Sequence, residues 1–293
     1  MSKRALVLGG GGATGNAWEI GVIAGLWDAG LDLTQTDLII GTSAGATVAA
    51  QITNATPTRL FADIMSAAPQ PRTGSVSADR GRVPMKPVID NMERTSRIIA
   101  AAEDAPDMRR RMGAGALELN AASDGSWQPR WRATVAARLP SQKWPEQTML
   151  ITAVDALSGE PVMFDRYSGV ELVDAVAASM SSSFPYSIGG NKYIDGGYRR
   201  NENADLAAGY ARVLVLSPFG GRSRHPHDWG MQLATQVDEL RAGGSSVETM
   251  FPGSNAEHMF GANAMDLSLR PLAAQEGYNH ARALAEQLTE GWR

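Results

Sequence analysis

The sequence predicts a protein of the α/β class, built on a mostly parallel central sheet. Two short apolar runs, at residues 4–8 and 38–40, read as buried strands, and each is followed at once by glycines and a segment with helical periodicity. A right-handed connection between two such strands makes them parallel neighbours in one sheet. Their carboxyl ends, and the glycines that follow them, are therefore expected at the same edge of that sheet.

The composition predicts an ordinary soluble globular protein and removes several classes of function. Of the 293 residues, 43% are hydrophobic and 20% are charged, and the net charge of −4 gives no reason to expect nucleic acid as a partner. Cysteine is absent, which excludes disulfides, a thiol nucleophile and cysteine-based metal sites. No signal peptide is visible, and no apolar run approaches the ~20 residues of a membrane span, so we expect a cytoplasmic protein. Peripheral contact with a membrane stays open.

Four consecutive glycines follow the first strand, and a helical pattern begins near Ala17 and stops at Gly30. Glycines contribute no packing, so such a loop serves to point backbone N–H groups at a ligand. An oxyanion beside an activated serine is one candidate ligand. The run from Gly10 to Gly15 also satisfies G-x-G-x-x-G, which is typical of dinucleotide binding. That fold requires an acid at the end of the second strand, where this chain has Gly41-Thr42-Ser43. A purely structural turn is the third interpretation.

The second strand leads into Gly41-Thr42-Ser43-Ala44-Gly45, the G-x-S-x-G pattern of a nucleophile elbow. A serine on a sharp strand-to-helix turn has a strained backbone, and glycine on both flanks avoids collisions. The turn exposes the hydroxyl above the sheet edge, and the N-terminus of the following helix points its positive end at the same place. We interpret Ser43 as a catalytic nucleophile. The alternative is a glycine-rich loop in which Ser43 caps the helix.

The rest of the chain predicts further strands and helices around one irregular stretch. We interpret residues 1–293 as a single domain in which about 69–146 form a variable, cap-like region. Within it, 88–112 read as a helix and 113–145 as irregular, and its three tryptophans are more typical of packing than of a membrane anchor. Regular structure returns afterwards, with strands expected at 148–154, 161–164, 213–216 and 247–251 and helices at 170–180, 229–242 and 268–292.

A nucleophilic serine needs a base, and the usual base is histidine. Every histidine lies late in the chain and reads as a surface or capping residue, namely His225, His227, His258 and His280. Asp195 is the better candidate, because an apolar residue precedes it and Gly196-Gly197 leave access to it open. Its pKa has to be raised by desolvation for this task. The alternative is an aspartate that stabilises a turn.

Three motifs, in this order, resemble those of the patatin-like phospholipases: Gly10 to Gly15, Gly41 to Gly45, and Asp195-Gly196-Gly197. The resemblance implies a three-layer α/β/α sandwich and a Ser–Asp dyad that hydrolyses acyl esters, usually of lipids, through an acyl-enzyme. It implies no metal and no cofactor. Carried over residue by residue, it makes Ser43 the nucleophile, Asp195 the base, the backbone of Gly10, Gly11 and Gly12 the oxyanion hole, and Gly15, Gly41, Gly45, Gly196 and Gly197 motif glycines.

One departure from the family pattern is Thr14, where many members carry Arg or Lys. That change leaves the head group open, so a lysolipid or a simple ester is as compatible as a diacyl phospholipid. The enzyme alternative is an α/β-hydrolase triad of Ser43, Asp195 and either His258 or His280, in the correct chain order. Too few strands precede Ser43 for that fold. The non-enzyme alternative is a nucleotide-binding module that uses the glycine loop alone.

Overall fold

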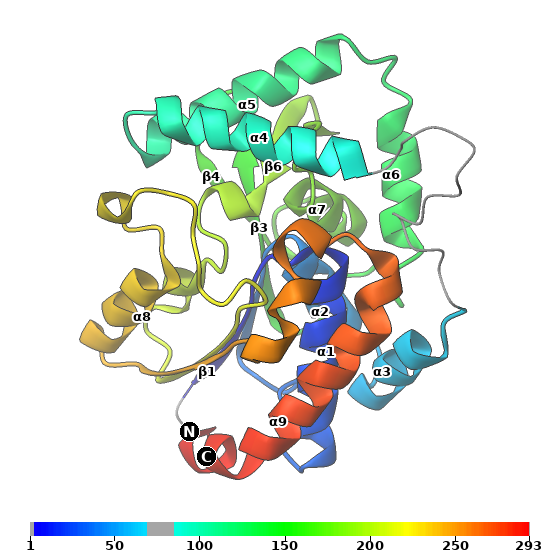
Figure 1. The fold of residues 1–293 in the computed structure, drawn as a ribbon, viewed down its shortest axis with the longest axis vertical. Helices are drawn as coiled ribbons and strands as arrows, with labels where there is room; N and C mark the ends of the chain where they lie inside the picture. Colours follow the sequence, from blue (N-terminus) through cyan, green and yellow to red (C-terminus); the bar gives the residue numbers. More distant parts are fainter. Residues whose placement is uncertain (1–2, 69–84, 293) are drawn as a thin grey trace.

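An eight-stranded sheet runs through the computed structural model, which describes residues 3–68 and 85–292 (Figure 1). Its strands follow the order β5-β6-β3-β2-β1-β7-β8, and β4 pairs with β3 outside this path. The pairs that link β3, β2, β1, β7 and β8 are parallel, which confirms the expected mostly parallel sheet. The strands are β1 (Arg4–Leu8), β2 (Leu38–Gly41), β3 (Thr148–Asp155), β4 (Pro161–Phe164), β5 (Tyr186–Ile188), β6 (Asn191–Asp195), β7 (Arg212–Leu216) and β8 (Ser246–Met250).

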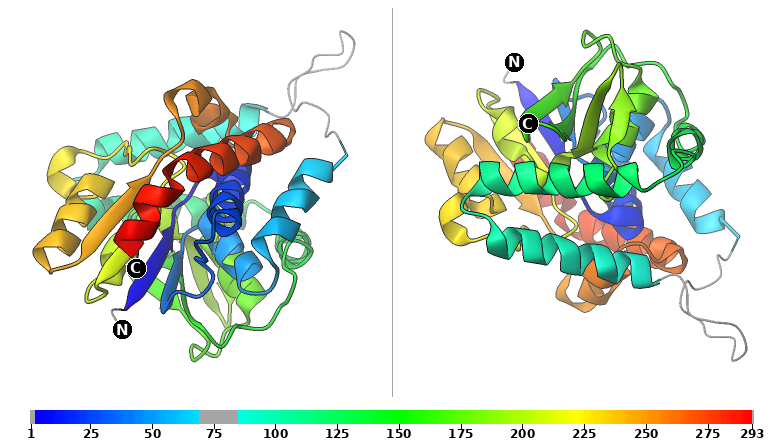
Figure 2. Two further views of the ribbon diagram at one scale, coloured as in Figure 1. Left: turned by 90° about the horizontal axis from the view of Figure 1, so that it is seen from below. Right: turned by 90° about the horizontal axis from the view of Figure 1, so that it is seen from above.

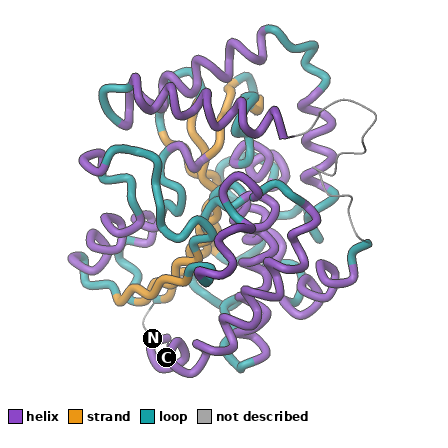
Figure 3. Tube along the Cα trace, viewed as in Figure 1, coloured by secondary structure: helices purple, strands orange, loops and turns teal. Residues whose placement is uncertain are grey.

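Alternate residues of the strands point to opposite faces, and helices cover both, so the fold is a three-layer sandwich. Leu6 and Leu8 of β1 pack in one buried cluster, and Ala5 and Val7 pack in another. The first face carries α1 (Gly12–Asp28), α2 (Ala44–Ile52), α3 (Pro57–Ser66), α7 (Leu172–Ser179) and α9 (Arg270–Trp292); the second carries α8 (Leu233–Ala242). Figure 3 shows the strands running through the centre of this arrangement.

The carboxyl ends of β2 and β6 are brought together by the register of β3. Gly41, the last residue of β2, pairs with Ile151, and Asp195, the last residue of β6, pairs with Ala153. Since β4 occupies the other edge of β3 over 151–154, β2 and β6 share one edge of β3. β6 is antiparallel to β3, so its carboxyl end faces the carboxyl end of β2 across a single residue of β3. This end-to-end meeting places the residue after each strand in one location.

The C-terminal helix α9 lies directly on α1, backbone against backbone. A Cβ at Gly21 of α1 would lie 2.0 Å from the carbonyl oxygen of Ala274, and one at Gly277 of α9 would lie 2.4 Å from that of Trp18. Only glycine permits this approach. The close contact fixes the start of α9 beside the start of α1, which is the helix that follows the glycine loop.

The region between β2 and β3 contains more helix than the sequence pattern indicated. The single helix expected at 88–112 is wrong, because α4 (Met85–Ala101) and α5 (Ala105–Ala121) are separate helices. Asp104 caps α5 by accepting a hydrogen bond from the Asp107 N–H at 2.7 Å, and Pro106 stands in its first turn. The irregular stretch expected at 113–145 is also wrong, since it contains the second half of α5 and α6 (Trp127–Ala136). The loop expected from residue 69 falls largely outside the described residues.

Helices α4 and α5 lie side by side across one end of the molecule, seen from above in Figure 2. Methionines of α5 pack on Val154 and Ile194 of the sheet. The three tryptophans of this region pack against the main core, in line with the packing interpretation; each indole N–H donates to a named acceptor, Trp127 to Asn120, Trp131 to Ala177 and Trp144 to Val170. In the described residues, no helix is long and apolar enough to cross a membrane.

Candidate active site

Ser43 stands on a strained turn between β2 and α2, as the elbow pattern indicates. Its backbone has φ 53° and ψ −114°, a conformation that costs a non-glycine residue about 1–3 kcal/mol. The flanking glycines are required by space. A Cβ at Gly45 would lie 2.2 Å from the carbonyl oxygen of Leu8, and one at Gly41 would lie 2.7 Å from the Cα of Ala46. The helix therefore begins hard against the neighbouring strand, and the turn has no room for larger residues.

Asp195 lies within hydrogen-bond distance of Ser43. The Ser43 Oγ donates to Asp195 Oδ2 at 2.9 Å, and the Gly197 N–H donates to Oδ1 at 2.8 Å. The Asp195 side chain is buried, and burial raises its pKa to about 6 although these two donors lower it. Gly196 is required here, because a Cβ would lie 2.2 Å from Thr152 Oγ1. The structure thus brings together the two residues that the sequence singled out, 152 positions apart.

A buried polar network holds the two ends together, and the sequence interpretation missed it. Asn203 donates from Nδ2 to Thr42 Oγ1 at 2.9 Å and to the Gly196 carbonyl at 3.3 Å. Thr42 Oγ1 also lies 2.9 Å from Thr152 Oγ1 on β3. Asn203 has φ 56°, so asparagine suits a left-handed position that most residues avoid. Its side chain links the turn before Ser43 to the turn after Asp195.

The glycine loop presents fewer backbone donors than the sequence suggested. The Gly10 N–H donates to the Asn201 carbonyl at 3.1 Å, so it is not free to hold an oxyanion, which corrects that part of the prediction. The N–H groups of Gly11 and Gly12 have no acceptor in the described part of the chain. The same holds for the N–H of Ala44, the residue after Ser43. Helix α1 begins at Gly12 rather than near Ala17, because the Gly15 N–H already donates to the Gly11 carbonyl at 2.9 Å.

A cavity of about 650 Å³ opens onto these groups, within the range of small-molecule sites. Ser43 and Asp195 line it together with Gly12 and Ala44. Much of the remaining wall is apolar and comes from α3, α6, the end of α7 and the segment before α9: Ile64, Met65, Trp131, Met180, Met265, Leu267 and Pro271. Two arginines, Arg138 and Arg270, also belong to the wall. The cavity is shaped for a ligand with an apolar part and a reacting group at Ser43.

The four histidines, all within the described residues, stay away from this cavity. His225 Nδ1 lies 2.7 Å from Ser223 Oγ, and burial lowers the pKa of its imidazole to about 4. His258 Nδ1 lies 3.1 Å from the Asn255 carbonyl oxygen. Neither of these, nor His227 or His280, makes a hydrogen bond to Ser43 or Asp195. The geometry therefore gives no support to the triad alternative.

Comparisons with solved structures show two distant likenesses. VipD from Legionella pneumophila matches with 12% sequence identity and a TM-score of 0.41, over 98% of this chain and 67% of that one. The type III effector protein ExoU matches with 17% identity and a TM-score of 0.39, over 97% of this chain and 53% of that one. The chain thus spans about half the length of ExoU. A comparison with curated proteins finds no match.

The family comparison is more extensive. The model of the patatin-like phospholipases matches residues 6–208, which include the glycine loop, the Ser43 turn and the Asp195 turn. These are the same three segments that the fold gathers at the carboxyl edge of the sheet. The chain therefore belongs to the patatin-like phospholipase family.

Proposed function

We propose that this protein is a serine acyl-ester hydrolase of the phospholipase A type, which acts on lipid esters through an acyl-enzyme formed by Ser43 and Asp195. The observation that carries the proposal is the 2.9 Å hydrogen bond from Ser43 Oγ to Asp195 Oδ2. A carboxyl whose pKa is about 6 is a far better base near neutral pH than an ordinary aspartate. Membership of a lipid-hydrolysing family supports the same chemistry.

In the proposed reaction, Asp195 takes the proton of Ser43 Oγ as the oxygen attacks the ester carbonyl. The N–H groups of Gly12 and Ala44, at the starts of α1 and α2, hold the negative oxygen of the tetrahedral intermediate. As that intermediate collapses, Asp195 passes its proton to the leaving alcohol, and the acyl group stays on Ser43. A water molecule then attacks the acyl-enzyme, gives its proton to Asp195 and releases the carboxylic acid, while Ser43 recovers its proton.

The substrate class follows from the apolar wall of the cavity. Methylene groups gain about 0.8 kcal/mol each on burial, so an acyl chain binds well to such a wall. Met65, Met265 and Leu267 are 40%, 52% and 37% exposed although they also line the cavity. Apolar side chains that are partly open to solvent at a cavity suit contact with a lipid aggregate. We include peripheral contact with a lipid surface in the proposal.

A covalent serine probe tests the assignment. A fluorophosphonate should label the protein once, and Ser43→Ala should abolish labelling and lower kcat for a short-chain ester by ~10³-fold or more. Ser182→Ala is the matched control, because Ser182 lines the same cavity without a proposed role, and labelling should persist. Asp195→Asn should lose activity to a similar degree. Labelling that survives Ser43→Ala would refute the proposal.

A further inference from the structure

The cavity at Ser43 contains two arginines from distant parts of the chain. Arg270, the first residue of α9, donates from Nη1 to the carbonyl oxygen of Ala13 at 3.3 Å. Arg138, just after α6, places its guanidinium over the Trp131 ring, 5.6 Å from the centroid. Trp131 is itself held by its indole N–H, which donates to the Ala177 carbonyl at 3.1 Å. Both guanidinium groups are therefore positioned by contacts with neighbouring groups rather than free in solvent.

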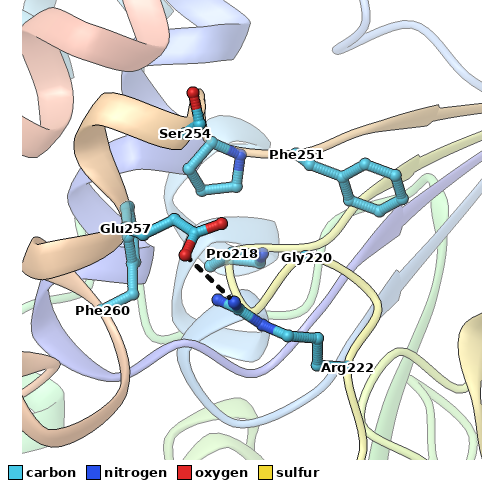
Figure 4. Close-up of a pocket in the computed structure, with 8 residues that line it drawn as sticks. Pro218, Gly220, Arg222, Phe251, Ser254, Glu257 and Phe260 are labelled. Atoms are coloured by element: carbon cyan, nitrogen blue, oxygen red, sulfur yellow. Dashed lines mark hydrogen bonds and ion pairs between the residues drawn. The ribbon is translucent and has the colours of Figure 1, made fainter.

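Neither arginine has a carboxylate partner in the described residues, which sets them apart from other arginines of this chain. The contrast is clear at a second cavity of about 300 Å³, shown in Figure 4, where Arg222 lies 3.3 Å from a carboxylate oxygen of Glu257. At the Ser43 cavity the only charge that acts on Arg270 is another positive one. Burial lowers the pKa of Arg270, and the charge of Arg138 lowers it further.

Two like charges held together without a counter-charge are costly, and an anionic ligand removes that cost. The arginines do not act on the base, since the pKa of Asp195 is lowered only by Gly197 and Ser43 and stays raised. They must therefore meet a different part of the substrate. Arg270 contacts Ala13, the residue next to Gly12, so an anion bound to Arg270 would lie beside the proposed oxyanion hole.

The glycine loop itself supplies no cation. Thr14 is fully buried, and its hydroxyl donates to the Ala264 carbonyl at 3.5 Å, so it faces the protein and not the cavity. Positive charge at this site comes instead from Arg138 and Arg270, which lie outside the loop. Building on the acyl hydrolase function proposed above, we infer that Arg138 and Arg270 bind the phosphodiester of a phospholipid or lysophospholipid whose acyl ester is held at Ser43.

A phosphodiester fits the site for two reasons. Guanidinium groups bind phosphate oxygens in pairs, and a pair of arginines supplies donors to more than one oxygen at once. The anion must also belong to the same molecule as the ester, because the cavity holds both ends of one ligand. In a glycerophospholipid, only the glycerol backbone separates the phosphate from an acyl ester, which matches the short separation between Arg270 and the start of α1.

The test compares two esters with the same acyl chain, lysophosphatidylcholine and the neutral monoacylglycerol, in micelles of a nonionic detergent. Arg138→Gln and Arg270→Gln should each lower the ratio of the two kcat/KM values, phospholipid over neutral lipid, by about ten- to a hundredfold, the scale of one charged hydrogen bond. Arg222→Gln is the matched control, because Arg222 lies at the other cavity, and it should leave the ratio unchanged. Glycerol 3-phosphate should inhibit hydrolysis of a neutral ester by the wild type more strongly than by the two variants.

The outcomes separate this inference from the proposed function. If both substrates fall equally in the arginine variants, the ratio stays constant and the inference is overturned. If a neutral ester is hydrolysed in a Ser43-dependent way but phospholipid is not preferred by the wild type, only the inference fails. If no ester is hydrolysed, the proposed function fails as well. Should Arg270→Gln unfold, since it contacts Ala13, Arg138→Gln decides the question alone, with Arg138→Lys expected to restore part of the ratio.

Discussion

The raised pKa of Asp195 makes a quantitative prediction about pH. If Asp195 is the base, only its ionised form is active, so kcat/KM should rise with pH and level off above neutrality. With a pKa of about 6, the ionised fraction is about 0.9 at pH 7 and about 0.1 at pH 5. Activity should therefore fall about tenfold between pH 7 and pH 5, and about tenfold for each further unit. An aspartate with its ordinary pKa near 3.9 would lose almost nothing over that range.

The assay is hydrolysis of a soluble short-chain ester, measured from pH 4 to pH 9, with the fold checked by circular dichroism at each pH. Because an unperturbed histidine titrates near 6.5, the four histidines must be replaced one at a time with Gln: His225, His227, His258 and His280. Each variant should keep the same acidic limb and stay within about tenfold of wild type. The reasoning fails if the limb moves to about pH 4, or if one folded histidine variant loses the limb together with the activity.

Two further predictions concern the glycine loop and the buried acid beneath it. At Gly12, a Cβ would lie 2.7 Å from the Ala264 carbonyl oxygen and φ is +65°, so Gly12→Ala should displace the proposed oxyanion donor and lower kcat by about 10²–10³-fold; unchanged turnover in a folded variant would assign the loop another role. Glu19 is fully buried and its pKa is raised well above 4.5, so the folded state keeps a proton that the unfolded state releases. Stability should therefore fall as pH rises above 4.5, by up to about 1.4 kcal/mol per unit, and Glu19→Gln should flatten this dependence and raise Tm at pH 7, as thermal unfolding at several pH values would show; parallel curves for the two proteins would contradict it.

Local features were readable from neighbouring residues alone. Gly41 and Gly45 flank Ser43 because steric limits act within a few residues, and a strand-to-helix turn can be recognised from its own sequence. The break before α5 was also present in the sequence, as Asp104 followed by Pro106, but the apolar periodicity obscured it. Asp195 was found by its two following glycines. Its raised pKa was a requirement of the chemistry and not an observation.

The tertiary structure decided which distant groups meet. Asp195 reaches Ser43 because antiparallel β6 takes over the edge of β3 where β2 ends, a register that no local pattern encodes. Asn201 takes the Gly10 N–H from across the site, 191 positions away in the chain, which removes one expected oxyanion donor. Arg270 arrives on a helix that packs against α1 through glycines. Side-chain type and local sterics are properties of short segments, whereas burial, pKa and counter-charge depend on which segments pack together.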